Sequence, residues 1–170
     1  QRFWIVMGAG RALSSLVDAR SILCAHPFFY IDPQWHLVMA LYSGADFHQG
    51  ATLSASKFVA RVREHNAEFS LFPRPLVGQS GSPDERGTTL KLVSAVGAGR
   101  DAVRDIRERF GCIANNAFGM TEIGVGLTVP EDLDDPDADG SCGVPAVYRE
   151  MRVVGADGAD VETGDPGELW

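Results

Sequence analysis

One run of side chains in this sequence combines groups suited to a phosphorylated ligand. Residues 115–122 read Asn-Asn-Ala-Phe-Gly-Met-Thr-Glu. An aromatic ring such as Phe118 can stack on a purine, the Thr121 hydroxyl can donate to a phosphate, and the Glu122 carboxylate suits Mg²⁺. Gly119 would let backbone approach a ligand closely. Spacing alone is equally compatible with an ordinary turn after a strand, capped by Thr121.

The segments before this run alternate between helix and strand patterns. Short apolar runs predict strands at residues 21–24, 45–49, 68–72, 90–96 and 112–118. Helical spacing predicts helices over residues 3–17, 35–42, 54–65 and 100–110, with Ser54 as an N-cap whose hydroxyl accepts a backbone N–H. Strands that are apolar on both faces and alternate with helices indicate a parallel sheet flanked by helices. Ligands bind such sheets at the carboxyl ends of strands, where residues 115–122 are expected.

The other segments predict loops and a small second unit. Pro27 and Pro33 are expected to bracket a loop, residues 78–88 form a surface loop, and residues 131–140 form an acidic loop. Residues 147–154 and 167–170 alternate like an antiparallel β unit. We therefore expect an α/β subdomain over residues 1–146 and the start of a β unit over residues 147–170.

Composition limits the classes of partner. The chain has 170 residues, 45% hydrophobic content and a formal net charge of -8, which suits one globular core. Lys and Arg are scattered, so nucleic acid and anionic membranes are disfavoured partners. No apolar run approaches the roughly 20 residues of a membrane span. The widely spaced Cys24, Cys112 and Cys142 predict reduced thiols and a cytoplasmic location.

Residues 115–122 resemble the Asn-x-Tyr-Gly-x-Thr-Glu motif of the adenylate-forming (AMP-binding) superfamily, which includes acyl-CoA synthetases, luciferases and peptide-synthetase adenylation domains. Other family segments are matched in the same order. Residues 26–30 resemble the Pro-Leu-Phe-His loop, residues 94–99 the Ser-Gly-Gly-Ala turn, and residues 143–145 and 164–169 the Gly-x-Pro and Gly-Glu-Leu segments. The resemblance spans nearly the whole chain. It implies a flavodoxin-like α/β subdomain followed by the beginning of a β-barrel subdomain.

The resemblance also implies roles for individual residues. Thr121 and Glu122 would be catalytic, with Thr121 on the nucleotide phosphate and Glu122 on Mg²⁺. Phe118 would stack near adenine, although it replaces the commoner Tyr, and Tyr30 would gate the acyl site where the family often has His. The residues implied to bind nucleotide are Gly97, Ala98, Gly99, Asn116, Ala117, Phe118, Gly119, Met120 and Thr121. The residues implied to bind the acyl group are Tyr30, Gly97 and Gly124.

The implied activity is that of an AMP-forming acid–thiol ligase similar to fatty-acid CoA ligases. ATP and a carboxylic acid would form an acyl-adenylate, and coenzyme A would then accept the acyl group; a carrier-protein thiol is the alternative acceptor. The family's phosphate loop is expected upstream of Gln1 and its catalytic Lys downstream of Trp170, so we expect this chain alone to be inactive. A homodimer is compatible with the sequence. The acid is not specified.

Two alternatives compete with this interpretation. Residues 97–102 read Gly-Ala-Gly-Arg-Asp-Ala, which satisfies the dinucleotide pattern of an NAD-binding domain. Such domains usually carry that turn after the first strand, whereas several predicted units precede it here. The other alternative is a non-catalytic α/β binding module.

Residues 135–140 resemble the first half of a calcium-binding loop, but Ala146 occupies the position where such a loop has its last ligand, Glu. A solvated acidic loop is therefore expected.

Overall fold

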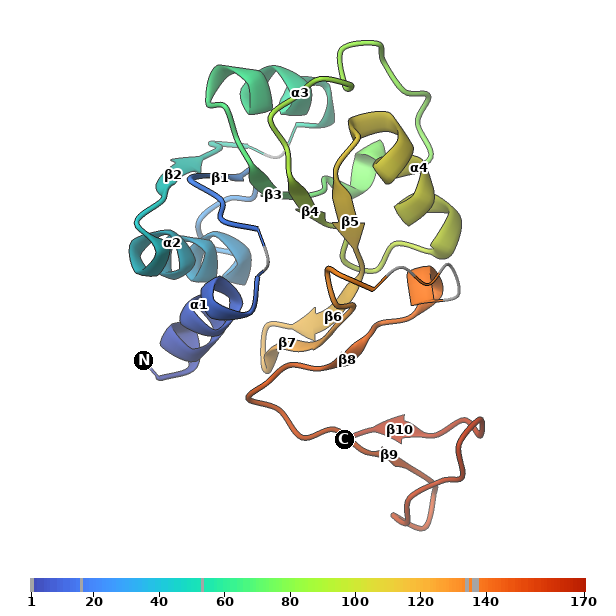
Figure 1. Cartoon of the computed structure of the whole chain (residues 1–170). Helices are drawn as coiled ribbons and strands as arrows, with labels where there is room; N and C mark the ends of the chain where they lie inside the picture. The colour runs from blue at the N-terminus through green and yellow to red at the C-terminus, as the bar shows by residue number, and fades with distance from the viewer. Residues whose placement is uncertain (1, 16, 53, 134, 136–137) are drawn as a thin grey trace.

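A five-stranded parallel sheet forms the centre of the computed structural model, which describes residues 2–15, 17–52, 54–133, 135 and 138–170 (Figure 1). Its strands, in spatial order, are β2 (Asp46–Gln49), β1 (Ser21–Cys24), β3 (Phe69–Leu71), β4 (Leu92–Ser94) and β5 (Ile113–Asn115). All four neighbouring pairs are parallel. The order 2-1-3-4-5 is that of flavodoxin-like folds, so the expected fold class is confirmed.

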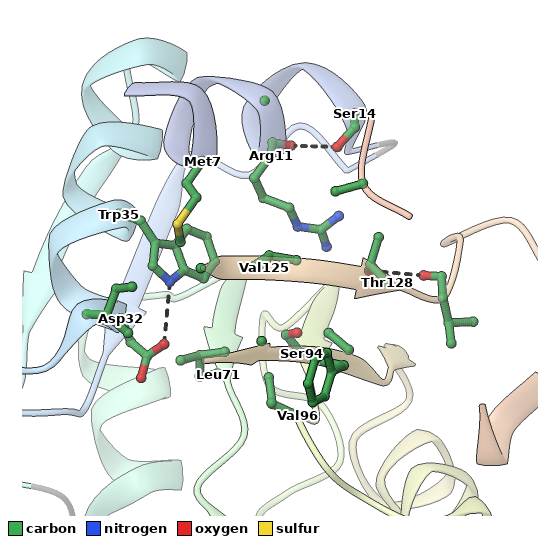
Figure 2. A pocket seen from close by; sticks show the side chains of 18 of the residues that line it. Met7, Arg11, Ser14, Asp32, Trp35, Leu71, Ser94, Val96, Val125 and Thr128 are labelled. Atoms are coloured by element: carbon green, nitrogen blue, oxygen red, sulfur yellow. Dashed lines mark hydrogen bonds between the residues drawn. The ribbon is translucent and has the colours of Figure 1, made fainter. Parts of the chain in front are cut away.

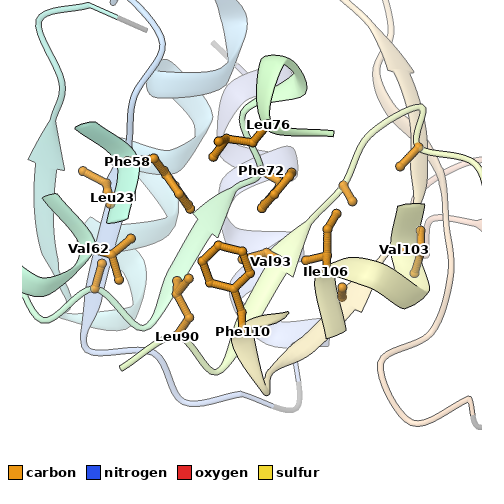
Figure 3. Close-up of a cluster of buried hydrophobic side chains, with 14 residues drawn as sticks. Leu23, Phe58, Val62, Phe72, Leu76, Leu90, Val93, Val103, Ile106 and Phe110 are labelled. Atoms are coloured by element: carbon orange, nitrogen blue, oxygen red, sulfur yellow. The ribbon is translucent and has the colours of Figure 1, made fainter. Parts of the chain in front are cut away.

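Helices cover both faces of this sheet. On one face lie α1 (Arg2–Ser14) and α2 (Ile31–Ser43), and on the other lie α3 (Ala55–Glu64) and α4 (Arg100–Phe110) (Figure 1). Each strand packs against the helices on both faces of the sheet, because successive side chains of a strand point to opposite faces. In β1, Ile22 packs with Met7 and Trp35, whereas Leu23 packs in the cluster of α3 and α4 drawn in Figure 3. This alternation explains why these strands read as continuous apolar runs.

The strand predicted over residues 112–118 is wrong, because the chain changes sheets in its middle. β5 ends at Asn115, and β6 (Ala117–Met120) pairs antiparallel with β7 (Gly124–Thr128), which pairs with β8 (Val144–Pro145). Buried amides fix this corner: Asn115 Nδ2 donates to the Val129 carbonyl at 2.9 Å. The motif at residues 115–122 is therefore partly a strand of a second sheet and does not simply follow a strand.

Two helix starts differ from expectation. α2 begins at Ile31, so Pro33 lies in its first turn and does not close a loop. Proline is tolerated there because the first backbone N–H groups of a helix have no intrahelical acceptor. Ser54 occupies the N-cap position of α3, but its hydroxyl contacts Ser56 Oγ at 3.3 Å and makes no capping hydrogen bond. The helix expected to reach residue 17 ends at Ser14.

Shorter elements complete the chain. The 3-10 turns are η1 (Arg74–Leu76) and η2 (Ala138–Gly140). The β unit expected near the end is reduced to β9 (Val153–Val154) paired antiparallel with β10 (Glu168–Leu169). Parts of the expected acidic loop, at residues 134, 136 and 137, lie outside the described residues. Cys24, Cys112 and Cys142 are free thiols. Within the described residues, no helix has the length and apolar character to cross a membrane.

Candidate functional site

A cavity of about 510 Å³, the main cavity, opens where the chain leaves β1, β3 and β4 (Figure 2). This is the point where strand order reverses, between β1 and β3, and open parallel sheets bind ligands at such points. Its walls come from α1, the start of α2, the β6–β7 hairpin and the segment after β8. Most of its lining is apolar, including Met7, Trp35, Leu71 and Val125.

The β6–β7 hairpin brings most of the motif to this cavity. Ala117, Phe118, Gly119, Met120 and Thr121 all line it. The register of the hairpin shifts between Phe118 and Gly119, and a Cβ added to Gly119 would lie 2.5 Å from the Gly124 carbonyl oxygen. Glycine at position 119 is therefore required for the two strands of the hairpin to approach so closely.

The glycine turn at residues 97–99 lies at a second, smaller cavity. Gly97 has φ +72°, which glycine adopts without strain, and Gly99 stands at the N-terminus of α4. Gly97, Ala98 and Gly99 line this cavity of about 290 Å³. It shares three lining residues with the main cavity: Phe72, Arg74 and Val96. The two groups of expected nucleotide-binding residues therefore surround adjoining spaces.

Asn116 connects these two groups through its side chain. Its Oδ1 accepts the backbone N–H groups of Gly97 at 2.9 Å and Ala117 at 2.8 Å. Its Nδ2 donates to the Ser141 carbonyl at 3.0 Å. The residue is 5% exposed and, among the described residues, is not part of either cavity lining. Asn116 thus positions the hairpin against the glycine turn.

Tyr30 lies at the rim of the main cavity, at the start of α2. Its side chain is half exposed, and its ring centroid is 5.9 Å from that of His26. Asp32 accepts from Trp35 Nε1 at 3.4 Å, and its other oxygen lies 3.7 Å from His26 Nδ1. These side chains form a polar part of the cavity rim. Tyr30 and Gly124, both expected at an acyl site, line the same cavity.

Glu122 is exposed in the turn between β6 and β7, next to Thr121. Among the described residues, no group of three or more His, Cys, Asp or Glu side chains could hold a metal ion by itself. A lone accessible carboxylate suits Mg²⁺, which proteins usually bind through one or two carboxylates together with substrate phosphates. Glu122 therefore fits a metal ion that arrives with a nucleotide.

Sequence reasoning missed the contribution of α1 and of the loop after β7. Met7 and Arg11 line the main cavity from α1, and Glu131 lines it from the loop. The Arg11 Nη2 atom lies 2.8 Å from Glu131 Oε1, with the side chains 13% and 2% exposed. Burial lowers the pKa of Arg11, and Glu131 opposes that shift. In the same helix, a Cβ on Gly10 would approach the ring of Tyr148 to 2.9 Å, so glycine at this position permits close packing in the cavity wall.

Comparison with known proteins identifies relatives of this fold. The family model described as AMP-binding enzyme matches residues 4–170. No curated protein matches the sequence. Three solved structures share the fold: a luciferase-like enzyme from Zophobas morio, the O-succinylbenzoate coenzyme A synthetase of Bacillus subtilis in complex with ATP and magnesium ion, and a long-chain-fatty-acid-CoA ligase from Archaeoglobus fulgidus.

The three structures agree with this chain over nearly its whole length. Identities are 17%, 19% and 19%, with TM-scores of 0.84, 0.78 and 0.76, in the order given. The matches cover 99%, 98% and 99% of this chain but only 42%, 36% and 37% of the other chains. This chain therefore corresponds to less than half of each of these proteins.

Proposed function

We propose, from the premise that this chain belongs to the AMP-binding enzyme family, that it is the nucleotide- and acid-binding part of an ATP-dependent acyl-CoA synthetase. The observation that carries this proposal is the main cavity. Thr121 and Phe118 of the family motif line the same space as Tyr30 and an apolar wall. A site that unites a phosphate donor, a stacking ring and an apolar cavity suits a substrate that is nucleotide at one end and acyl group at the other.

In the proposed reaction, a carboxylate oxygen of the acid attacks the α-phosphorus of ATP. A P–O bond to the acid forms, the bond to pyrophosphate breaks, and an acyl-adenylate results. Mg²⁺, when bound, would neutralise charge on the phosphates, and Glu122 is the residue that would hold it. Thr121 would donate its hydroxyl to a phosphate oxygen, and such a preplaced donor stabilises charge that develops in the transition state. Phe118 would hold the adenine by stacking.

The apolar wall has its own role in this proposal. Met7, Trp35, Leu71 and Val125 would bind the acyl chain and keep water from the acyl-adenylate, which hydrolysis would otherwise consume. The thiol of coenzyme A would then attack the acyl carbon, so that a thioester forms and AMP leaves. A cytoplasmic location is part of the same proposal, because ATP and coenzyme A are available there.

The related structures also support a coarser alternative, an acid-adenylating enzyme with another acceptor. One solved structure with this fold is described as an amide bond synthetase from Marinactinospora thermotolerans, with 16% identity and a TM-score of 0.80. The dinucleotide-binding alternative for residues 97–102 has no such support, since the family assignment covers that turn.

Acid-dependent exchange of pyrophosphate into ATP by the full-length protein tests the proposal. Exchange that requires a carboxylic acid would establish adenylation, and thioester formation on adding coenzyme A would establish the acceptor. A folded protein that gives no exchange with short, long and aromatic acids would contradict the proposed function.

A further inference from the structure

Arg74 lies where the main cavity and the smaller cavity adjoin, and it lines both of them. Its side chain is exposed and forms no hydrogen bond or ion pair with any residue that the structure describes. A guanidinium carries five N–H donors in a planar arrangement that matches a carboxylate or phosphate group. Arg74 can therefore bind an anionic part of a ligand without giving up a contact within the protein.

The other charged residues that line the main cavity leave Arg74 uncompensated. Arg11 pairs with Glu131 at 2.8 Å. Asp32 belongs to the polar part of the rim at the start of α2, and Asp132 lies in the loop after β7. Neither of these two carboxylates pairs with Arg74 in the described part of the chain. A ligand that brings its own negative charge would supply the missing partner.

The backbone holds Arg74 in this place. Arg74 begins the 3-10 turn η1, in which the N–H of Leu76 donates to the Pro73 carbonyl at 2.8 Å. Leu76 is buried in the cluster drawn in Figure 3, and Pro75 restricts the backbone of the residue before it. Because the segment that carries the charge is anchored, less conformational entropy is lost when a ligand binds there.

The strand order places Arg74 and the start of the hairpin on opposite sides of the glycine turn. β3, β4 and β5 lie side by side, and their last residues are in register (Figure 1). Arg74 follows β3, the glycine turn follows β4, and the hairpin follows β5. Neighbouring strands are about 4.8 Å apart, so the segments that leave β3 and β5 start about 10 Å apart. Gly97 meets both sides: its N–H binds Asn116, and a Cβ on it would lie 3.1 Å from Arg74 Nη1.

This position separates Arg74 from the groups assigned to the nucleotide. In the proposed function, Thr121 in the turn of the hairpin binds the phosphates, and the reacting carboxylate lies beside them. The purine that would stack on Phe118 carries no charge. Arg74 instead continues the segment of the apolar wall, since Leu71 and Phe72 shortly before it also line the main cavity. The anion that fits Arg74 therefore belongs to the acid, at a distance from its reacting end.

Resting on the proposed function, we infer that the carboxylic acid carries a second carboxylate, which Arg74 binds while the first carboxylate is adenylated. The site then takes a dicarboxylic acid, with the body of the acid against the apolar wall. A monocarboxylic acid of the same length leaves the Arg74 guanidinium without a partner. Arg74 thereby determines specificity within the cavity.

The test compares matched acids in pyrophosphate exchange by the full-length protein. Butanoic, hexanoic and benzoic acid are each assayed in three forms: plain, with a second carboxylate at the terminal or para position, and with a carboxamide at that position. The carboxamide has nearly the shape of the carboxylate but no charge. In the frame with the highest activity, we expect the dicarboxylic acid to exceed the carboxamide in kcat/KM by on the order of 10-fold, because its hydrogen bonds to the guanidinium are charge-assisted.

Variants then connect the preference to Arg74. Arg74→Gln removes the charge, so the preference for the dicarboxylic acid should disappear. Arg74→Lys keeps the charge without the paired donors and should retain part of the preference. Arg74→Glu should reverse it, so that an acid with a terminal amine exceeds the dicarboxylic acid. The control Arg104→Gln changes an exposed arginine on α4, outside both cavity linings, and should retain the full preference.

The outcomes separate this inference from the proposed function. Exchange without a preference for the dicarboxylic acid, or a preference that survives Arg74→Gln, would overturn the inference and leave the synthetase proposal standing. An equal loss for every acid in Arg74→Gln would also overturn it, because Arg74 would then serve the phosphates, if the KM for ATP rises, or the reacting carboxylate, if it does not. Absence of exchange with every acid would overturn both the inference and the proposed function.

Discussion

The side-chain oxygen of Asn116 accepts the backbone N–H of Gly97 at 2.9 Å, across 19 positions of sequence. This bond joins the corner between β5 and β6 to the turn that precedes α4. Because the hairpin after Asn116 lines the main cavity and the turn at Gly97 lines the smaller one, a single amide sets the relative position of the two proposed halves of the nucleotide site.

Replacing Asn116 with Ala should destabilise the protein. The substitution leaves the N–H groups of Gly97 and Ala117 and the carbonyl of Ser141 without this partner. Of these three residues only Ala117 is buried, and a buried polar group that loses its partner costs about 1–3 kcal/mol, so we expect a loss of about that size in the free energy of unfolding. Urea denaturation measures it. Asn116→Asp keeps the acceptor and should lose less; equal stability of Asn116→Ala and the wild type would contradict this account.

Gly124 should not tolerate a side chain. Its φ is +71°, and an added Cβ would lie 2.2 Å from Met7 Sδ in the cavity wall. The left-handed backbone alone should cost Gly124→Ala about 1–2 kcal/mol, and the contact should add to this. Gly126→Ala is the matched control in the same strand, since its nearest neighbour, Met151 Cε, is 3.4 Å away. Comparable melting temperatures for the two variants would show that the explanation is wrong.

The sequence predicted the central fold well because each strand of the parallel sheet is buried on both faces. Ile22 and Leu23 in β1 pack into opposite clusters, which produces an apolar run that periodicity detects. The change of sheet at Asn116 was not detectable in the same way. Residues on both sides of it suit strands, and the corner depends on amide contacts to Gly97 and Val129 that lie far away in sequence.

For the candidate site too, residues in a local sequence motif could be predicted, whereas residues brought together from distant parts of the chain could not. Phe118 and Thr121 were predicted as site residues because they form a local motif, and both line the main cavity. Arg11 and Glu131 were missed because their pairing joins α1 to a loop 120 residues later in the chain. Nothing in the local sequence of either residue distinguishes it from an exposed charge on a helix or a loop.

His36 should make stability fall in mild acid. It is fully buried, its ring lies 3.7 Å from that of Trp35, and its Nδ1 lies 2.6 Å from the Asp32 carbonyl. Desolvation by burial lowers its pKa from 6.5 to about 3; contact with the Asp32 carbonyl opposes this shift, and the nearby His26 and Arg11 add to it.

The sign of the pH effect follows from that lowered pKa. Between about pH 3 and pH 6.5 the unfolded chain binds a proton on His36 that the folded protein does not. Stability is therefore fully present above pH 6.5 and decreases as the pH falls, by at most about 1.4 kcal/mol per unit from this residue. Urea denaturation at pH 7.5 and pH 5 measures the change. His36→Phe keeps an aromatic ring and should show a shallower dependence; an unchanged slope would refute the assignment.

Adenylation through the hairpin motif is tested most directly by pyrophosphate exchange in the full-length protein, with Glu122→Gln compared against Glu108→Gln. Glu122 is exposed in the turn beside Thr121, and Glu108 is exposed on α4, so neither change should affect folding. We predict acid-dependent exchange in the wild type and in Glu108→Gln, and a rate at least on the order of 100-fold lower in Glu122→Gln, as expected when an electrostatic contribution to the transition state is removed. Undiminished exchange in Glu122→Gln, with the protein folded, would contradict the role assigned to the motif.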